Sequence, residues 1–176
     1  YASNVTITLT AADSGSGVNH TYYQIDSGSW TLYTSPVIVS TEATHTLKYY
    51  SIDNAGNTES VKGPFTFKID KTKPVTTHIF SGTTGNNGWF VSNVTITLSA
   101  TDAGSGVNHT YYQIDSGSWT TYISPVVVSI EDTHTLKYYS VDKAGNTEQA
   151  KGPFTFKIDK TKPMTTHLLS GNIGNN

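Results

Sequence analysis

Apolar and polar residues alternate along most of the chain, in short runs separated by turn residues. Val5, Ile7 and Leu9 alternate with threonines, and the same alternation returns from Val94. Successive side chains of a β-strand point to opposite faces, so this pattern predicts strands with one buried face. The strands are expected at residues 5–11, 21–26, 31–33, 36–40, 45–53 and 65–70. No segment shows the 3.6-residue apolar period of a helix.

The segments between these runs are rich in Asp, Asn, Gly and Ser, as at residues 13–17, 26–29 and 53–57. These residues tolerate positive φ or bond their own backbone, and so favour tight turns. Short strands at regular spacing with polar turns are typical of an antiparallel β-sandwich. The predicted fold class is therefore all-β.

The sequence repeats itself at an offset of 89 residues. Residues 1–87 match residues 90–176 at 68 of 87 positions, which indicates a tandem duplication. One period is long enough for one small sandwich domain and too long for a solenoid coil. The proline of the sequence DKTKP at residues 70–74 ends ladder pairing and marks a linker.

The position of the linker implies that the first domain boundary lies inside the sequence and not at its first residue. Residues 1–73 form a domain that lacks its first strand, residues 74–162 form a complete domain, and residues 163–176 begin a following repeat. In the complete domain we expect strands at residues 74–80 and 89–98. We also consider that the first strand of the last segment fills the edge of domain one in another chain, by strand addition. The residues of that inter-subunit strand are Pro163, Met164, Thr165, Thr166, His167, Leu168, Leu169 and Ser170.

Composition narrows the function classes. Val, Ile and Thr supply 54 of 176 residues, which agrees with the β prediction. The chain has 11 Lys, no Arg and a net charge of -2, so we expect no nucleic-acid partner. No apolar run approaches a membrane span, no signal peptide is visible, and the absence of Cys excludes disulfides and thiolate metal sites.

Three segments of each period carry a resemblance to a known family. The runs TAADSGSGVNHTYYQIDSGSW, HTLKYYSIDNAGNTE and FKIDKTKP resemble the immunoglobulin-like repeats of secreted and cell-surface proteins of bacteria and archaea. The resemblance is closest to repeats first named for a leptospiral outer-membrane protein. It implies tandem immunoglobulin-like (fibronectin-III-like) sandwiches, an extracellular or cell-surface location, and a role as spacer, stalk, shaft or accessory module without catalytic residues.

Two kinds of residue are candidates for modification and metal binding. The four Asn-x-Thr sequons, candidates for glycosylation, are at Asn4, Asn19, Asn93 and Asn108. The carboxylates at loop ends, candidate Ca²⁺ ligands, are Asp13, Asp53, Asp70, Asp102, Asp142 and Asp159. The alternative for the latter is that each Asp caps a Gly-containing turn, since no loop has the dense Asp spacing of a calcium loop. No cofactor is required by either interpretation.

Aromatic residues are the best candidates for recognition. The residues that flank a turn in each repeat, and that we consider for carbohydrate contact, are Trp30, Tyr33, Trp119 and Tyr122. Their alternative role is cross-strand packing. No histidine pair or nucleophile elbow points to catalysis.

The sequence therefore predicts a structural extracellular repeat protein, not an enzyme, that forms a shaft, sheath or filament by tandem or strand-complemented domains. Its expected partners are further copies or a continuation of the same array. The alternative function is a carbohydrate-binding or adhesin accessory module that contacts glycans.

Overall fold

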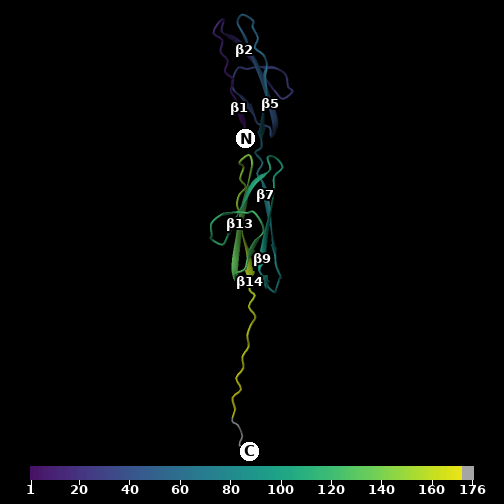
Figure 1. The fold of residues 1–176 in the computed structure, drawn as a ribbon, viewed down its shortest axis with the longest axis vertical. Helices are drawn as coiled ribbons and strands as arrows, with labels where there is room; N and C mark the ends of the chain where they lie inside the picture. Colours follow the sequence, from purple (N-terminus) through teal and green to yellow (C-terminus); the bar gives the residue numbers. More distant parts are fainter. Residues whose placement is uncertain (172–176) are drawn as a thin grey trace, which may run out of the picture.

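The structure is a computed structural model that describes residues 1–171. Two β-rich units lie end to end, with an extended segment after the last strand (Figure 1). We call them domain one and domain two. The strands of domain one are β1 (Val5–Ile7), β2 (Val18–Ile25), β3 (Thr31–Leu32), β4 (Val37–Val39), β5 (Ala43–Asp53) and β6 (Lys62–Ile69). Those of domain two are β7 (Val75–Ser81), β8 (Trp89–Phe90), β9 (Val94–Thr101), β10 (Val107–Ile114), β11 (Thr120–Thr121), β12 (Val126–Val128), β13 (Asp132–Asp142) and β14 (Lys151–Ile158).

Each domain consists of two sheets. In domain two the order β12-β9-β7 forms one sheet and β11-β10-β13-β14-β8 forms the other. In domain one the corresponding sheets are β1-β4 and β3-β2-β5-β6. All pairs are antiparallel except β8 with β14. The predicted all-β, immunoglobulin-like sandwich is confirmed.

The core of domain two lies between its sheets. Val94, Ile96 and Leu98 of β9 are buried and alternate with less buried threonines, as the apolar pattern predicts. The opposite sheet contributes Leu136, Tyr138, Phe156 and Ile158. In domain one the buried apolar core has only three members, Ile7, Val39 and Ile69.

Six of the predicted strands agree with the structure to within three residues at each end, and two differ more. The strand expected at residues 5–11 ends at Ile7, although its counterpart β9 continues to Thr101. The difference arises because β7 pairs with β9 along its whole length, whereas residues 8–12 have no such neighbour among residues 1–171. The strand expected at residues 89–98 is two strands, since β8 joins β14 and β9 joins the other sheet.

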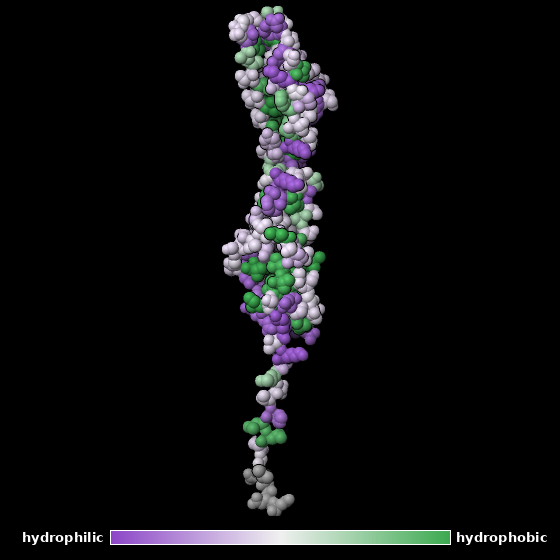
Figure 2. Space-filling model, viewed as in Figure 1, coloured by the Kyte–Doolittle hydropathy of each residue, from purple (hydrophilic) through white to green (hydrophobic). Residues whose placement is uncertain are grey.

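After β14 the described chain runs as an extended segment with both hydrophilic and hydrophobic side chains exposed (Figure 2). No helix within residues 1–171 is long and apolar enough to cross a membrane.

Candidate functional sites

The linker between β6 and β7 is held by both domains. Asp70 and Pro74, at its two ends, are buried. Lys71 Nζ donates to the carbonyl oxygen of Ser40 at 2.6 Å, which ties the linker to domain one. Thr72 Oγ1 donates to Glu42 at 3.1 Å in the same domain. A linker with buried ends and side-chain hydrogen bonds has little freedom to bend.

Asp70 joins the linker to domain two. Its Oδ2 accepts a hydrogen bond from the Ser105 N–H at 2.5 Å, and its backbone carbonyl accepts one from Asn146 Nδ2 at 2.8 Å. Gly104 lies so close that a Cβ at this position would collide with the Asp70 carboxylate. Hydrogen bonding by Ser105 holds the pKa of Asp70 below its usual value of 3.8, against the opposing effect of burial. The junction therefore favours an ionised Asp70.

Three carboxylates meet at this junction. Asp70, Asp102 and Asp142 each offer an oxygen within 4.8 Å of the others. Asp142 accepts N–H bonds from Gly145 and Asn146 at 2.7 and 2.8 Å. Asp102 Oδ1 accepts from the Gly106 N–H at 2.7 Å. Asp102 Oδ2 is buried and is the only such side-chain atom of the described residues without a hydrogen-bond partner.

This arrangement suits a hard cation. Three clustered carboxylates repel one another, and a buried oxygen without a donor is costly. A divalent cation relieves both penalties, and Ca²⁺ and Mg²⁺ prefer oxygen ligands. An oxygen-only set of carboxylates fits these ions and not a thiolate-seeking metal.

The structure brings together three of the six aspartates that the sequence indicated. Asp13 and Asp53 are the domain-one counterparts of Asp102 and Asp142, with no third carboxylate within the same distance among residues 1–171. Asp159 corresponds to Asp70 but is exposed, where it accepts a hydrogen bond from the Thr161 N–H at 3.0 Å. Sequence reasoning missed Ser105 and Asn146, although the Asp-x-x-x-Asn spacing of the turn was a signal for the latter.

The aromatic candidates of each repeat do not share one surface. Trp119 packs edge-on against Tyr139 at a ring distance of 4.8 Å. Tyr122 packs instead against Tyr112 on the core side, and its hydroxyl accepts a hydrogen bond from Leu98 N at 3.1 Å. Trp30 and Tyr33 of domain one are separated in the same way, because Trp30 contacts Tyr50 and Tyr33 contacts Tyr23.

A different aromatic group lies on the outer face of each domain. Tyr22 and Tyr50 stack at 5.3 Å, with Trp30 against one end of the pair. Trp30 and Trp119 are 38% and 40% exposed, so both indole rings reach solvent. We call these groups the outer aromatic rows. Their members are His20, Tyr22, Tyr50 and Trp30 in domain one, and His109, Tyr111, Tyr139 and Trp119 in domain two.

The remaining candidate residues are accessible. All four sequon asparagines, Asn4, Asn19, Asn93 and Asn108, are exposed. The segment predicted as an inter-subunit strand, residues 163–170, is exposed throughout and has no strand partner within the described chain.

Comparison with known proteins gives a structural likeness only. No protein-family profile matches the sequence. No curated protein matches it either. One similar solved structure is that of the fibronectin(III)-like modules of Clostridium thermocellum CbhA. Its sequence is 13% identical, its TM-score is 0.47, and the match covers 89% of this chain and 85% of that one. The immunoglobulin-like assignment rests on the strand order of the domains, and the likeness to leptospiral repeats rests on sequence motifs alone.

Proposed function

We propose that the chain is an extracellular structural module that acts as a shaft and sets a distance between whatever lies at its two ends. The observation that carries this proposal is the linker whose ends are buried and whose side chains bond domain one, while Asp70 bonds domain two. The domains lie end to end (Figure 1). With a stiff linker between them, each additional domain therefore lengthens the rod. The proposal includes no enzymatic activity and no required cofactor.

Two features support an extracellular location. The exposed Asn-x-Thr sites are accessible to glycosylation, and the motifs resemble repeats of secreted and cell-surface proteins. Intact mass of the native protein tests the first feature. A mass above that of the peptide supports glycosylation of this surface, and a mass equal to that of the peptide contradicts it.

Small-angle X-ray scattering on the monomeric chain tests the shaft. A stiff linker predicts one elongated particle, whose scattering fits the end-to-end arrangement of the two domains. A broad ensemble of bent arrangements would contradict the proposal. The variant Lys71→Ala, which removes the bond to Ser40, should widen the distribution, whereas Lys48→Ala on β5 should leave it unchanged.

We further propose that the junction carboxylates bind Ca²⁺, and that the bound ion stiffens the linker. The buried, unpartnered Oδ2 of Asp102 supports this proposal. Calorimetric titration with CaCl₂ should show binding, and the melting temperature should fall with chelator. An unchanged melting temperature would favour turn capping as the role of these residues.

One substitution separates the two roles. Asp102→Asn should abolish the response to Ca²⁺, yet stabilise the cation-free chain because it removes one of three repelling charges. Asp13→Asn, at the equivalent position of domain one, should leave the response of the monomeric chain to Ca²⁺ intact. If Asp102→Asn destabilises the chain equally with and without Ca²⁺, the cation proposal is wrong.

A second candidate function, carbohydrate binding, is favoured by the outer aromatic rows. Partly exposed tryptophans beside stacked tyrosines offer apolar ring faces for sugars. Pull-down with insoluble polysaccharides tests this function. Binding should be lost in Trp30→Ala with Trp119→Ala, and retained in Ile123→Ala, which removes a side chain that is 90% exposed outside the row.

A further inference from the structure

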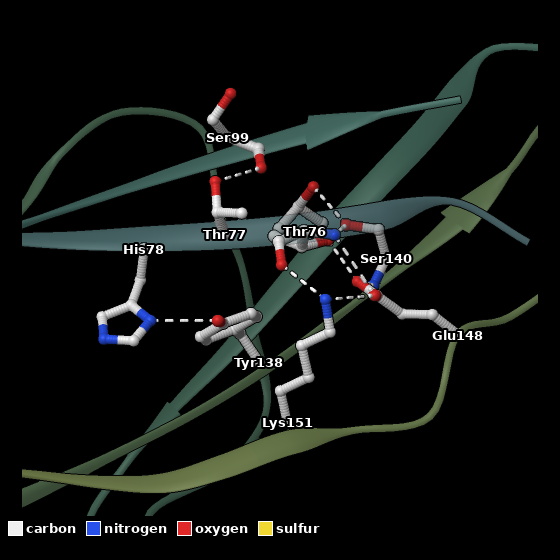
Figure 3. Close-up of polar contacts among 9 residues, drawn as sticks. Thr76, Thr77, His78, Ser99, Tyr138, Ser140, Glu148 and Lys151 are labelled. Atoms are coloured by element: carbon white, nitrogen blue, oxygen red, sulfur yellow. Dashed lines mark hydrogen bonds and ion pairs between the residues drawn. The ribbon is translucent and has the colours of Figure 1, made fainter. Parts of the chain in front are cut away.

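Strand β7 closes one edge of domain two through a buried polar cluster (Figure 3). Thr76 Oγ1 lies 2.6 Å from Ser140 Oγ and also bonds Glu148. The Thr76 N–H donates to Glu148 Oε2 at 3.2 Å, and Lys151 Nζ donates to the Thr76 carbonyl at 2.6 Å. Thr76, Ser140 and Glu148 are all buried, so this cluster is an internal joint.

The next inward residues of β7 add aromatic contacts. His78 Nδ1 lies 3.0 Å from the hydroxyl oxygen of Tyr138, and its ring lies 4.2 Å from that of Phe154. The Phe80 ring lies 4.7 Å from Phe156. Between these residues, Thr77 and Ile79 face solvent. The inward face of β7 is therefore Thr76, His78 and Phe80.

Domain one contains the same residue types that contact β7 in domain two, but it has no strand equivalent to β7. The counterparts of the residues that β7 contacts are Ser51, Glu59, Lys62, Tyr49, Phe65 and Phe67, identical in type to Ser140, Glu148, Lys151, Tyr138, Phe154 and Phe156. Phe65 is 51% exposed, and the Glu59 side chain is 33% exposed, against 6% for that of Glu148. Every contact partner for such a strand is present, and each is more accessible than in domain two.

An open groove marks the position. It has a volume of about 210 Å³ and runs between residues 8–12 and the β5 and β6 side chains of Tyr49, Ser51 and Lys62. Residues 8–12 correspond to the β9 residues that pair with β7 in domain two. The groove therefore lies where a strand equivalent to β7 would run.

We propose that residues 163–170 of a second copy of this chain fill this groove as an added β-strand. Thr165, Thr166 and His167 repeat Thr76, Thr77 and His78, and Leu169 takes the place of Phe80. The β7 register transfers directly: Thr165 pairs with Ala11, and His167 with Leu9. Thr165 then meets Ser51 and Glu59, His167 meets Tyr49 and Phe65, and Leu169 meets Phe67.

A second copy is the occupant because the segment points away from its own groove. In Figure 1 it extends beyond domain two, on the side opposite to domain one. Met164, Leu168 and Leu169 are 88%, 90% and 86% exposed there. Residues 1–171 of each copy carry this groove and this segment at opposite ends, so the contact is heterologous and repeats head to tail into a filament. This inference deepens the proposed shaft function and rests on it.

The docked segment also rebuilds the junction. The linker residues that precede it, 159–163, have the same sequence as 70–74. Asp159 of the second copy then takes the position of Asp70, beside Asp13 and Asp53 of the first copy. The assembly thus forms a second three-carboxylate cluster at each contact between copies, and Ca²⁺ strengthens self-association.

Analytical ultracentrifugation of the full chain over a range of concentrations tests the contact. The wild-type chain should form species heavier than 19.0 kDa as concentration rises. Leu169→Asp places a charge on the inward face and should weaken self-association at least about 10-fold. Leu168→Asp carries the same charge on the outward face and should associate like the wild type. Because this segment is exposed in the single chain, neither variant perturbs the fold.

Mixing two defective chains gives the sharper result. Leu169→Asp keeps its groove, and Ser51→Lys keeps its segment but blocks the groove. Each alone should stay monomeric, and an equimolar mixture should form a 1:1 dimer. Ser60→Lys, an exposed position outside the groove, should self-associate normally. A mixture that stays monomeric, or Leu169→Asp that associates like the wild type, overturns the proposal.

The outcome is separable from that of the shaft proposal. A wild-type chain that is monomeric at high concentration but stiff in scattering excludes the added strand and leaves a shaft. A chain that associates by the segment but bends at residues 70–74 retains the contact and excludes the shaft.

Discussion

Domain one and domain two have nearly the same sequence and different interiors. Leu136 and Tyr138 are 0% and 2% exposed, whereas their counterparts Leu47 and Tyr49 are only half-buried. The residues are identical, so local propensity does not explain the difference. Domain two has β7 at the edge of one sheet and β8 at the edge of the other, and domain one has neither strand. These two edge strands, of seven and two residues, thus decide how well an immunoglobulin-like core is closed.

The comparison extends to polar groups. Glu148 is buried among Thr76, Ser140 and Lys151, whereas Glu59 forms an ion pair with Lys62 at 2.8 Å near the surface. This ion pair lowers the pKa of Glu59. Burial raises the pKa of Tyr138 and lowers that of His78, as expected where water is excluded. Strand β7 therefore excludes water from an edge of domain two whose equivalent in domain one is partly exposed to solvent.

The largest expected effect is a difference in core truncation. Leu136→Ala should cost about 2–5 kcal/mol, because it leaves a cavity in a closed core. Leu47→Ala should cost less, about 1–2 kcal/mol, because its site already contacts solvent. Calorimetry should show a shift of only the domain-two transition for the first variant and only the domain-one transition for the second. Equal losses of stability in the two variants would contradict a difference in core closure between the domains.

The buried carboxylate comes next. Glu148→Gln should destabilise domain two by roughly 1.5–3 kcal/mol, because it removes charge-assisted bonds to Thr76 and Lys151. Glu59→Gln should change domain one by less than about 0.5 kcal/mol, as expected for a partly exposed surface pair. Urea denaturation measures both variants. If Glu59→Gln costs as much as Glu148→Gln, the edge of domain one is already closed.

Glycines at equivalent positions test the junction. Gly104→Ala should cost about 1–3 kcal/mol through overpacking, because its Cβ would collide with the Asp70 carboxylate. Gly15→Ala should be nearly neutral, since the nearest atom to its Cβ is Asp13 Oδ2 at 3.5 Å. Scattering of the monomer should show a changed angle between domains only for Gly104→Ala. An unchanged angle would mean that Asp70 does not orient the domains.

The smallest expected effect is a pH dependence that both domains share. His45 bonds the Asp26 carboxylate and the Thr41 carbonyl oxygen, each at 2.9 Å, and His134 bonds Asp115 and Ile130 at 3.0 Å. The Thr41 carbonyl, and then Asp26, raise the pKa of His45 above 6.5, and the bond to His45 lowers the pKa of Asp26 below 3.8. In domain two, burial opposes the shift of His134, but its hydrogen bonds raise the pKa.

The signs follow from linkage. The raised pKa of His45 stabilises the fold fully below pH 6.5, and this contribution is lost as pH rises through the folded value. The lowered pKa of Asp26 contributes above pH 3.8 and is lost on further acidification. Melting temperatures of both domains should therefore fall slightly from pH 6 to pH 8. His45→Gln should flatten the slope of domain one only, and an unchanged slope would exclude the pair as its cause.

Much of the fold was predictable from the sequence. The alternation around Val94, Ile96 and Leu98 gave strand β9 and its buried face, and the Asp and Gly clusters marked the turns. The acidic candidates included the three that meet at the junction. Carbohydrate contact by Trp119 and Tyr122 stays a prediction, but the two do not share a surface, because alternation within strands places their neighbours, Tyr139 and Tyr112, on opposite faces of the sheet.

The sequence by itself determined the strands, the turns and the repeat, because these depend on local periodicity and backbone preference. Only the tertiary structure decided which strand has a neighbour. Residues 5–11 and 94–100 share six of seven residue types, and yet only the second set is paired along its whole length. Ladder pairing and burial depend on segments distant in the chain, so identical sequences have a closed edge beside Thr76 and an open groove beside Ser51.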